Sequence, residues 1–62
     1  MIIKKIYGDG TYAIFKLFDI NLEFDIWWLK GFVIESDVDN IEPYTYWEFE
    51  LTRDAEYEVI EV

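Results

Sequence analysis

The fold is decided by YTYWEFELTRDAEYEVIEV, residues 44–62, in which aromatic and apolar residues alternate with carboxylates. Alternation with a period of two is typical of β-strands that bury one face and expose the other. The pattern is interrupted around Arg53-Asp54-Ala55. We therefore predict two strands, over residues 44–52 and 56–62, joined as a hairpin.

The side chains of this predicted hairpin fix its register. A loop centred on Asp54 sets Phe49 opposite Val59 on an apolar face and Glu50 opposite Glu58 on the other face. A shift of one residue would mix core and surface positions, so the first register is favoured. Like charges that face each other across strands are destabilising, which suggests a partner that supplies positive charge. The predicted carboxylate cluster consists of Glu48, Glu50, Glu56 and Glu58.

The N-terminal part of the chain predicts a second hairpin. Strands over residues 2–7 and 11–18 are rich in β-branched and aromatic residues, and Gly8-Asp9-Gly10 between them tolerates positive φ angles. Both faces of the second strand are apolar. One face carries Tyr12, Ile14 and Phe18, and the other carries Ala13, Phe15 and Leu17.

Between the two hairpins, the pattern predicts a turn at residues 19–21, a strand over 22–28, a turn at 30–31 and a short strand over 32–34. A helix over residues 19–30 is the alternative, because several apolar residues there also fall at helical spacing. Trp27 and Trp28 are adjacent, so in a strand they point to opposite faces, and one of them is expected outside the core.

These elements predict one all-β domain over residues 1–62. Five to six short strands favour either a small, strongly bent antiparallel sheet or an SH3-like or OB-like barrel, because a flat sheet of this size buries only one face. No apolar run approaches the roughly 18 residues of a membrane span, and no signal peptide is evident, so a cytoplasmic protein is expected.

The formal net charge is −9 and is unevenly distributed. Residues 1–18 carry three lysines against Asp9, whereas residues 19–62 carry the other thirteen acids against Lys30 and Arg53. Such a charge repels nucleic acid and anionic membranes and attracts basic protein surfaces. We therefore expect a basic protein partner, itself a nucleic-acid-binding protein, and no direct contact with nucleic acid or membrane.

Carboxylates interleaved with Tyr44, Tyr46 and Trp47 could imitate nucleic acid, with carboxylates in place of phosphates and rings in place of bases. In size and charge the chain resembles the small acidic proteins with which phages and mobile elements block restriction, CRISPR or repair enzymes. The resemblance implies an inhibitor, although no family motif carries it. A merely solvated acidic face is the alternative. The predicted partner-binding residues are Glu48, Glu50, Glu56, Glu58, Asp37, Asp39, Glu42, Tyr46 and Trp27.

The acidic loop over residues 36–43 suggests an EF-hand calcium site, because closely spaced carboxylates suit calcium. Counted from Asp37, positions five and six are Ile41 and Glu42, where the motif needs an oxygen ligand and a glycine. We predict an ordinary loop and no metal or other cofactor. Without Cys or His, and with little room for a cleft, the chain is also predicted not to be an enzyme.

The exposed aromatic residues support a second hypothesis of a different class. Strands with two apolar faces could pack one face into the core and the other against a second copy of the chain. The protein would then be a homo-oligomeric assembly or adaptor protein, a homodimer or a larger ring, kept soluble by its acidic side.

Overall fold

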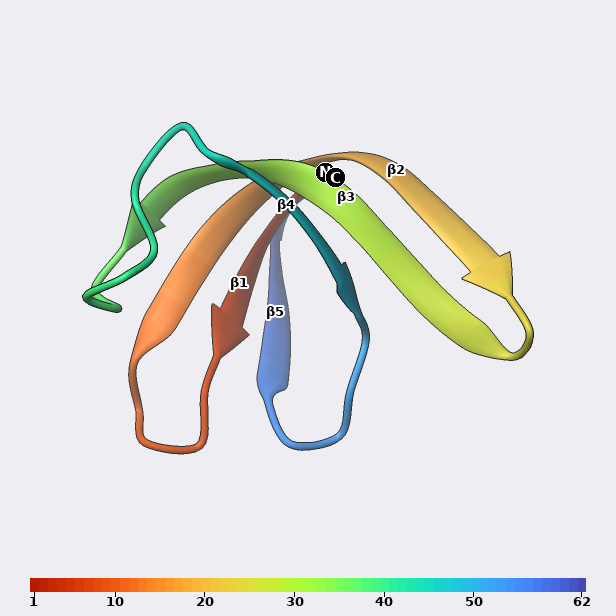
Figure 1. Ribbon diagram of the computed structural model, residues 1–62, viewed down its shortest axis with the longest axis horizontal. Coiled ribbons are helices and arrows are strands. Elements are labelled where there is room, and N and C mark those ends of the chain that lie inside the picture. The colour runs from red at the N-terminus through yellow and green to blue at the C-terminus, as the bar shows by residue number, and fades with distance from the viewer.

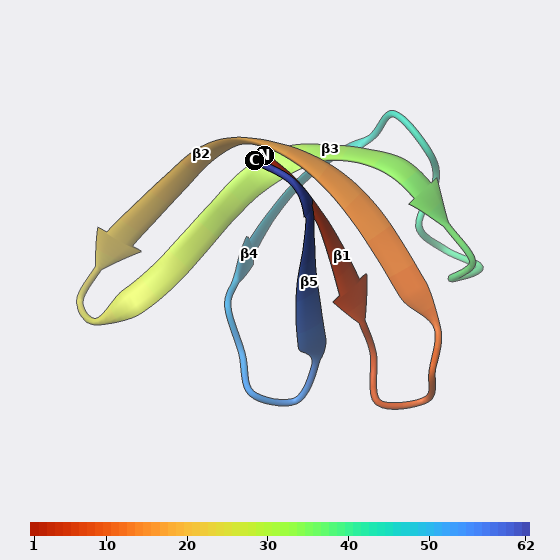
Figure 2. The same ribbon diagram turned by 180° about the vertical axis from the view of Figure 1, so that it is seen from behind.

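The computed structural model describes residues 1–62 and consists of five antiparallel strands in one sheet, without a helix. The sheet has the strand order β4-β3-β2-β1-β5 and is bent into an arch (Figure 1). Its two edge strands lie on opposite sides of the molecule, with β4 in front in Figure 1 and β5 in front in Figure 2. The strands are β1 (Ile2–Ile6), β2 (Tyr12–Glu23), β3 (Ile26–Ser36), β4 (Tyr46–Glu50) and β5 (Glu56–Glu61).

The predicted all-β class is confirmed, and of the two predicted architectures the chain forms the bent antiparallel sheet. Strands β4 and β5 are its two edges and do not hydrogen-bond to each other, so the sheet is not closed into a barrel. No helix that could cross a membrane is present.

The segment between residues 19 and 34 is a strand pair rather than a helix, but its predicted turns are wrong. Strand β2 continues through residues 19–21, and β3 continues through Lys30 and Gly31. Gly31 does not form a turn. It lies where a Cβ atom would overlap the carbonyl oxygen of Lys16 in β2. A glycine therefore permits the close approach of the two strands at this point.

The turn between β2 and β3 lies instead at Phe24 and Asp25, whose φ angles are 51° and 63°. Two central residues with positive φ are the signature of a tight hairpin turn that suits the twist of the strands, usually built from Asn and Gly. Phe24 carries none of the usual turn chemistry, and a bulky residue in this region costs about 1–2 kcal/mol. Asp25 is the one usual turn residue here, so the sequence signal for this turn was weak.

The predicted hairpin of residues 44–62 is also wrong in its pairing. Strand β4 pairs with β3, where Phe49 lies opposite Leu29, and β5 pairs with β1, where Val59 lies opposite Ile3. Alternation specifies which residues share a face but not which strand lies beside them. Three strands of the sheet separate the two segments that the pattern had joined.

The core lies on the inner, concave side of the arch. Phe15 and Val33 are almost completely buried, and the ring centroid of Phe15 lies 4.7 Å from that of Phe49 in β4. Ile41 packs the long loop between β3 and β4 against this core. The buried residues are Ile3, Ala13, Phe15, Leu17, Leu29, Val33 and Ile41.

Two aspartates stabilise the short loops at the lower edge of the arch. Asp9 accepts hydrogen bonds from the hydroxyl group of Thr11 at 2.6 Å and from its backbone N–H at 2.9 Å. Asp54 accepts a hydrogen bond from the hydroxyl group of Thr52. Because these bonds favour the charged form, they lower the pKa of Asp9 and of Asp54 below the ordinary value.

The lowered pKa values predict a loss of stability in acid. A carboxyl group whose pKa is lower in the folded state stabilises the fold above its unfolded pKa of about 3.9, and this stabilisation is lost as the pH falls through the folded value. The double variant Thr11→Val/Thr52→Val lacks both hydroxyl groups. Its free energy of unfolding should therefore change less between about pH 7 and about pH 3 than that of the wild type. Urea unfolding at both pH values measures this, and an unchanged difference would contradict it.

Candidate protein-binding surfaces

Three aromatic rings meet on the outer, convex face of the sheet. Phe18 of β2, Phe32 of β3 and Tyr46 of β4 have ring centroids 5.6, 5.8 and 6.0 Å apart. Phe18 lies on this face because it follows Lys16 by two residues in β2, and the irregular pairing between Leu17 and Asp19 leaves it without a paired residue in β3. We call Phe18, Phe32 and Tyr46 the outer aromatic patch.

The outer aromatic patch is accessible to a partner. The relative exposures of Phe18, Phe32 and Tyr46 are 59%, 48% and 48%. The rings contact one another in tilted, stacked and edge-on arrangements, each favourable for aromatic pairs. A contiguous group of exposed rings marks an interaction surface more often than scattered single apolar residues do.

A charged border lies beside the patch on β3 and β4. The Tyr46 hydroxyl group is 3.4 Å from Oε2 of Glu48, and Nζ of Lys30 is 3.6 Å from Oε1 of the same glutamate. Glu50 lies on the same face two residues further along β4. Three of the predicted site residues, Tyr46, Glu48 and Glu50, therefore lie on one surface with the other two rings of the patch.

The predicted carboxylate cluster does not form. Glu48 and Glu50 lie on β4, whereas Glu56 and Glu58 lie on β5 at the other edge of the sheet. Glu58 is opposite Lys4. No glutamate of β4 therefore lies opposite a glutamate of β5, and the repulsion that partly suggested a basic partner does not arise.

The loop between β3 and β4 contains three further predicted site residues, and one of them has a structural contact. Oδ1 of Asp37 accepts a hydrogen bond of 2.7 Å from the backbone N–H of Tyr12, which ties the loop to β2. Asp39 and Glu42 are exposed, and no cluster of three acidic side chains in the chain is arranged to hold a metal ion. The Tyr12 hydroxyl group donates to Glu35 at 2.8 Å, which raises the pKa of Tyr12.

Trp27, the remaining predicted site residue, lies on the inner side of the arch and Trp28 on the outer side, as their adjacency in a strand predicts. Trp27 lines a hollow of about 240 Å³ between the β2–β3 hairpin and strands β1 and β5. Every residue that lines it is hydrophobic. The apolar hollow is formed by Met1, Ile3, Ile20, Trp27, Leu29, Leu51, Tyr57 and Val59.

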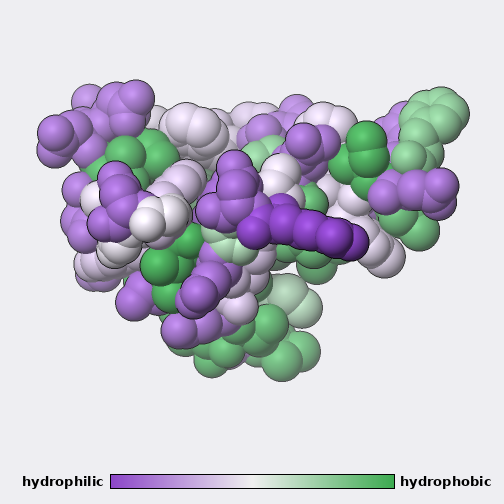
Figure 3. All heavy atoms as spheres, turned by 90° about the horizontal axis from the view of Figure 1, so that it is seen from below, coloured by the Kyte–Doolittle hydropathy of each residue, from purple (hydrophilic) through white to green (hydrophobic).

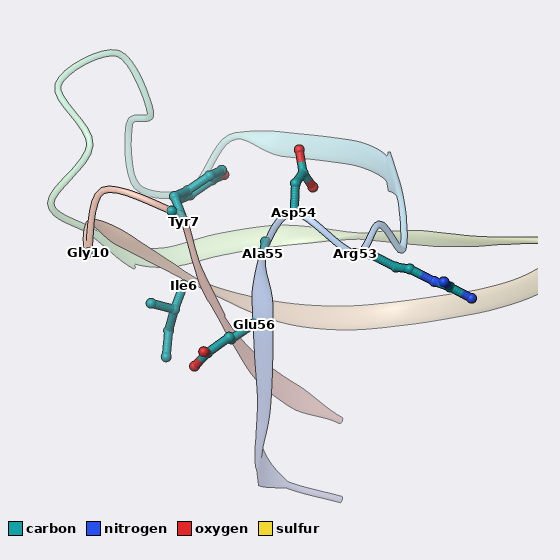
Figure 4. A pocket seen from close by; sticks show the side chains of 8 residues that line it. Ile6, Tyr7, Gly10, Arg53, Asp54, Ala55 and Glu56 are labelled. Carbon is teal, nitrogen blue, oxygen red and sulfur yellow. The ribbon is translucent and has the colours of Figure 1, made fainter.

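A second, more polar cavity of about 320 Å³ lies between the β1–β2 turn and the β4–β5 loop. Its charged residues are Arg53, Asp54 and Glu56. Their side chains point in different directions, and Arg53 extends out of the cavity (Figure 4). The cavity therefore brings no pair of acid and base groups together.

Lys5 has an environment that the sequence pattern did not indicate. Its Nζ atom lies 4.8 Å from the ring centroid of Phe49, 5.0 Å from that of Tyr7 and 5.9 Å from that of Tyr57. Phe49 belongs to β4, Tyr57 belongs to β5, and Tyr7 directly follows β1, so the ammonium group connects the two edges of the arch by cation–π contacts. Burial and the nearby Tyr57 raise the pKa of Tyr7.

We expect Lys5→Gln to lower the free energy of unfolding by about 1–2 kcal/mol, because it removes the charge from the faces of three rings. The matched control is Lys16→Gln, which changes the net charge equally at an exposed position. Urea denaturation followed by tryptophan fluorescence measures both. Equal effects of the two substitutions would show that the contacts of Lys5 with the three rings contribute nothing to stability.

Comparison of the chain with protein-family models, with curated proteins and with solved structures found no match. The two candidate surfaces, the outer aromatic patch and the apolar hollow, are therefore defined by the geometry of this chain alone. Sequence reasoning identified Tyr46 and Trp27, one residue of each, but missed their neighbours Phe18, Phe32 and Leu51 as site residues. Alternation placed Phe18 on an apolar face of its strand, but the order of the strands brings these neighbours together, and the sequence carried no signal for that order.

Proposed function

We propose that this protein is a non-catalytic binding protein that attaches to a basic surface of a partner protein. The partner that its charge fits best is an enzyme whose nucleic-acid-binding surface it occupies and thereby inhibits. The observation that supports the proposal is the position of the outer aromatic patch beside the carboxylates of β4, in a chain of net charge −9.

The patch and the carboxylates are complementary to a surface that binds nucleic acid. Such surfaces present Lys and Arg to phosphates and apolar or aromatic groups to bases. Glu48 and Glu50 can meet the basic groups while Phe32 and Tyr46 contact the apolar ones. Exposed aromatic residues surrounded by polar groups are the usual source of affinity in protein interfaces.

The remaining carboxylates act at longer range. Lys30 and Glu48 form the one ion pair of the molecule, so most of its acidic side chains have no basic partner within 4.0 Å. Their summed field attracts a basic protein and accelerates association, an effect that salt screens. In this proposal Glu56 and Glu58, on the far edge of the sheet, contribute to attraction but not to contact.

The test compares two variants with the same change of net charge. The wild-type protein, used as bait in a cell extract, should recover a basic, nucleic-acid-binding protein, and binding should weaken steeply with salt. Glu48→Gln/Glu50→Gln should weaken binding at least about tenfold. The control Glu56→Gln/Glu58→Gln should have a much smaller effect. Recovery of no basic protein would refute the proposal, and equal effects of the two variants would refute the assigned contact surface.

A further inference from the structure

The tip of the β2–β3 hairpin exposes a large aromatic residue in a strained conformation. Phe24 is 91% exposed and has a φ angle of 51°, in a region that bulky residues rarely adopt. The hairpin projects from the body of the arch (Figure 1), and hydrophobic side chains are visible at its end, on the right in Figure 3. Little of this side chain is covered by the rest of the chain, so its ring is accessible to a contact from outside the chain.

The apolar hollow is a suitable receptor for such a side chain. It is lined by hydrophobic residues only, and its rim includes the half-exposed Trp27 and Val59. No charged group has to be desolvated when the hollow is filled, so the cost that limits the burial of polar surface does not arise. A cavity that is apolar and open favours an aromatic or aliphatic occupant.

Charges around the tip and the hollow are complementary. Glu23 and Asp25 flank Phe24 at the tip. Arg53 follows Leu51 of the hollow by two residues, takes part in no ion pair, and extends away from the cavity beside it (Figure 4). The ring of Phe24 thus matches the apolar hollow, and the two carboxylates beside it match the basic group of Arg53. Tip and hollow are present on the same chain.

We infer that two copies of the chain associate with their concave faces together, and that Phe24 of each copy occupies the apolar hollow of the other. Glu23 and Asp25 of one copy then face the guanidinium group of Arg53 in the other copy. The arrangement is a two-fold symmetric dimer, in which one kind of contact is made twice. It leaves the outer aromatic patch of both copies free, so the inference is independent of the proposed function.

Sedimentation equilibrium from low to high micromolar concentration is the first test. The wild type should form a dimer, and Phe24→Asn should weaken it at least about tenfold. Because Asn tolerates positive φ, the same substitution should leave the thermal midpoint of the dilute protein unchanged or raised. The control Phe32→Asn, on the outer face, should dimerise like the wild type.

Disulfide trapping tests where the tip lies, because the chain has no cysteine of its own. Mixed Phe24→Cys and Val59→Cys proteins should cross-link to each other in high yield under mild oxidation. A mixture of Phe24→Cys with Ile34→Cys, on the outer face, should not. A monomer at every concentration would overturn the inference and leave the hollow to a foreign peptide. Undiminished dimerisation of Phe24→Asn, or equal cross-linking in the two mixtures, would overturn it as well.

Discussion

Gly31→Ala is expected to unfold most of the protein at room temperature. The added Cβ atom would overlap the carbonyl oxygen of Lys16 and lie 3.0 Å from Cα of Leu17, and both are backbone atoms of the neighbouring strand β2. Backbone atoms in the middle of a sheet cannot rotate away as a side chain can, so β2 and β3 would have to separate. We expect a loss of about 3 kcal/mol or more, in the range of the most damaging single substitutions.

Such a loss is comparable with the whole stability of a small domain, which is about 0.05–0.15 kcal/mol per residue. The matched control is Gly8→Ala, because a Cβ atom there meets its nearest neighbour, the carbonyl oxygen of Asp54, at 3.9 Å. The control should remain within about 0.5 kcal/mol of the wild type. Far-ultraviolet circular dichroism and urea titration measure both variants. A folded Gly31→Ala with wild-type stability would show that β2 and β3 do not approach as closely as described.

Gly31 also shows where sequence reasoning reached its limit. The pattern Lys30-Gly31 was interpreted as a turn, because glycine after a polar residue commonly marks one. A glycine that admits a neighbouring backbone has the same sequence signature as a glycine that turns the chain. The true turn at Phe24-Asp25 contains neither glycine nor asparagine, and Asp25 alone is a weak signature. Local patterns therefore predicted that these residues form strands but misplaced the boundaries.

Pairing between strands was the other limit. Alternation correctly placed Phe49 and Tyr57 on the inner side and Glu48, Glu50 and Glu58 on the outer side. It could not reveal that β4 and β5 pair with different strands, because each alternating segment fits any neighbour with the same pattern of faces. The predicted carboxylate cluster depended on pairing between β4 and β5, and it does not form because these strands are not neighbours. The basic partner was inferred mainly from net charge, which does not depend on the pairing.

Phe32→Ser is expected to produce the largest loss of partner binding among substitutions that leave the protein folded. Phe32 is the central residue of the outer aromatic patch, because it lies on β3, between the strands β2 and β4 that carry Phe18 and Tyr46. Removal of a central aromatic residue from an interface commonly costs about 2–4 kcal/mol, which is about 30-fold to 1000-fold in the dissociation constant. The substitution lies on the outer face, away from the buried core, and should affect stability far less than binding.

The control for Phe32→Ser is Ile34→Ser, two residues further along β3 on the same outer face. Ile34 is similarly exposed but takes no part in the aromatic contacts, so the control should lose less than about tenfold in affinity. Titration of the captured partner with each variant, followed by calorimetry, measures the dissociation constants. Equal losses for the two variants would mean that general apolar area rather than the three rings drives binding. Undiminished binding by Phe32→Ser would place the contact surface elsewhere, while the salt dependence of binding would still report whether the partner is basic.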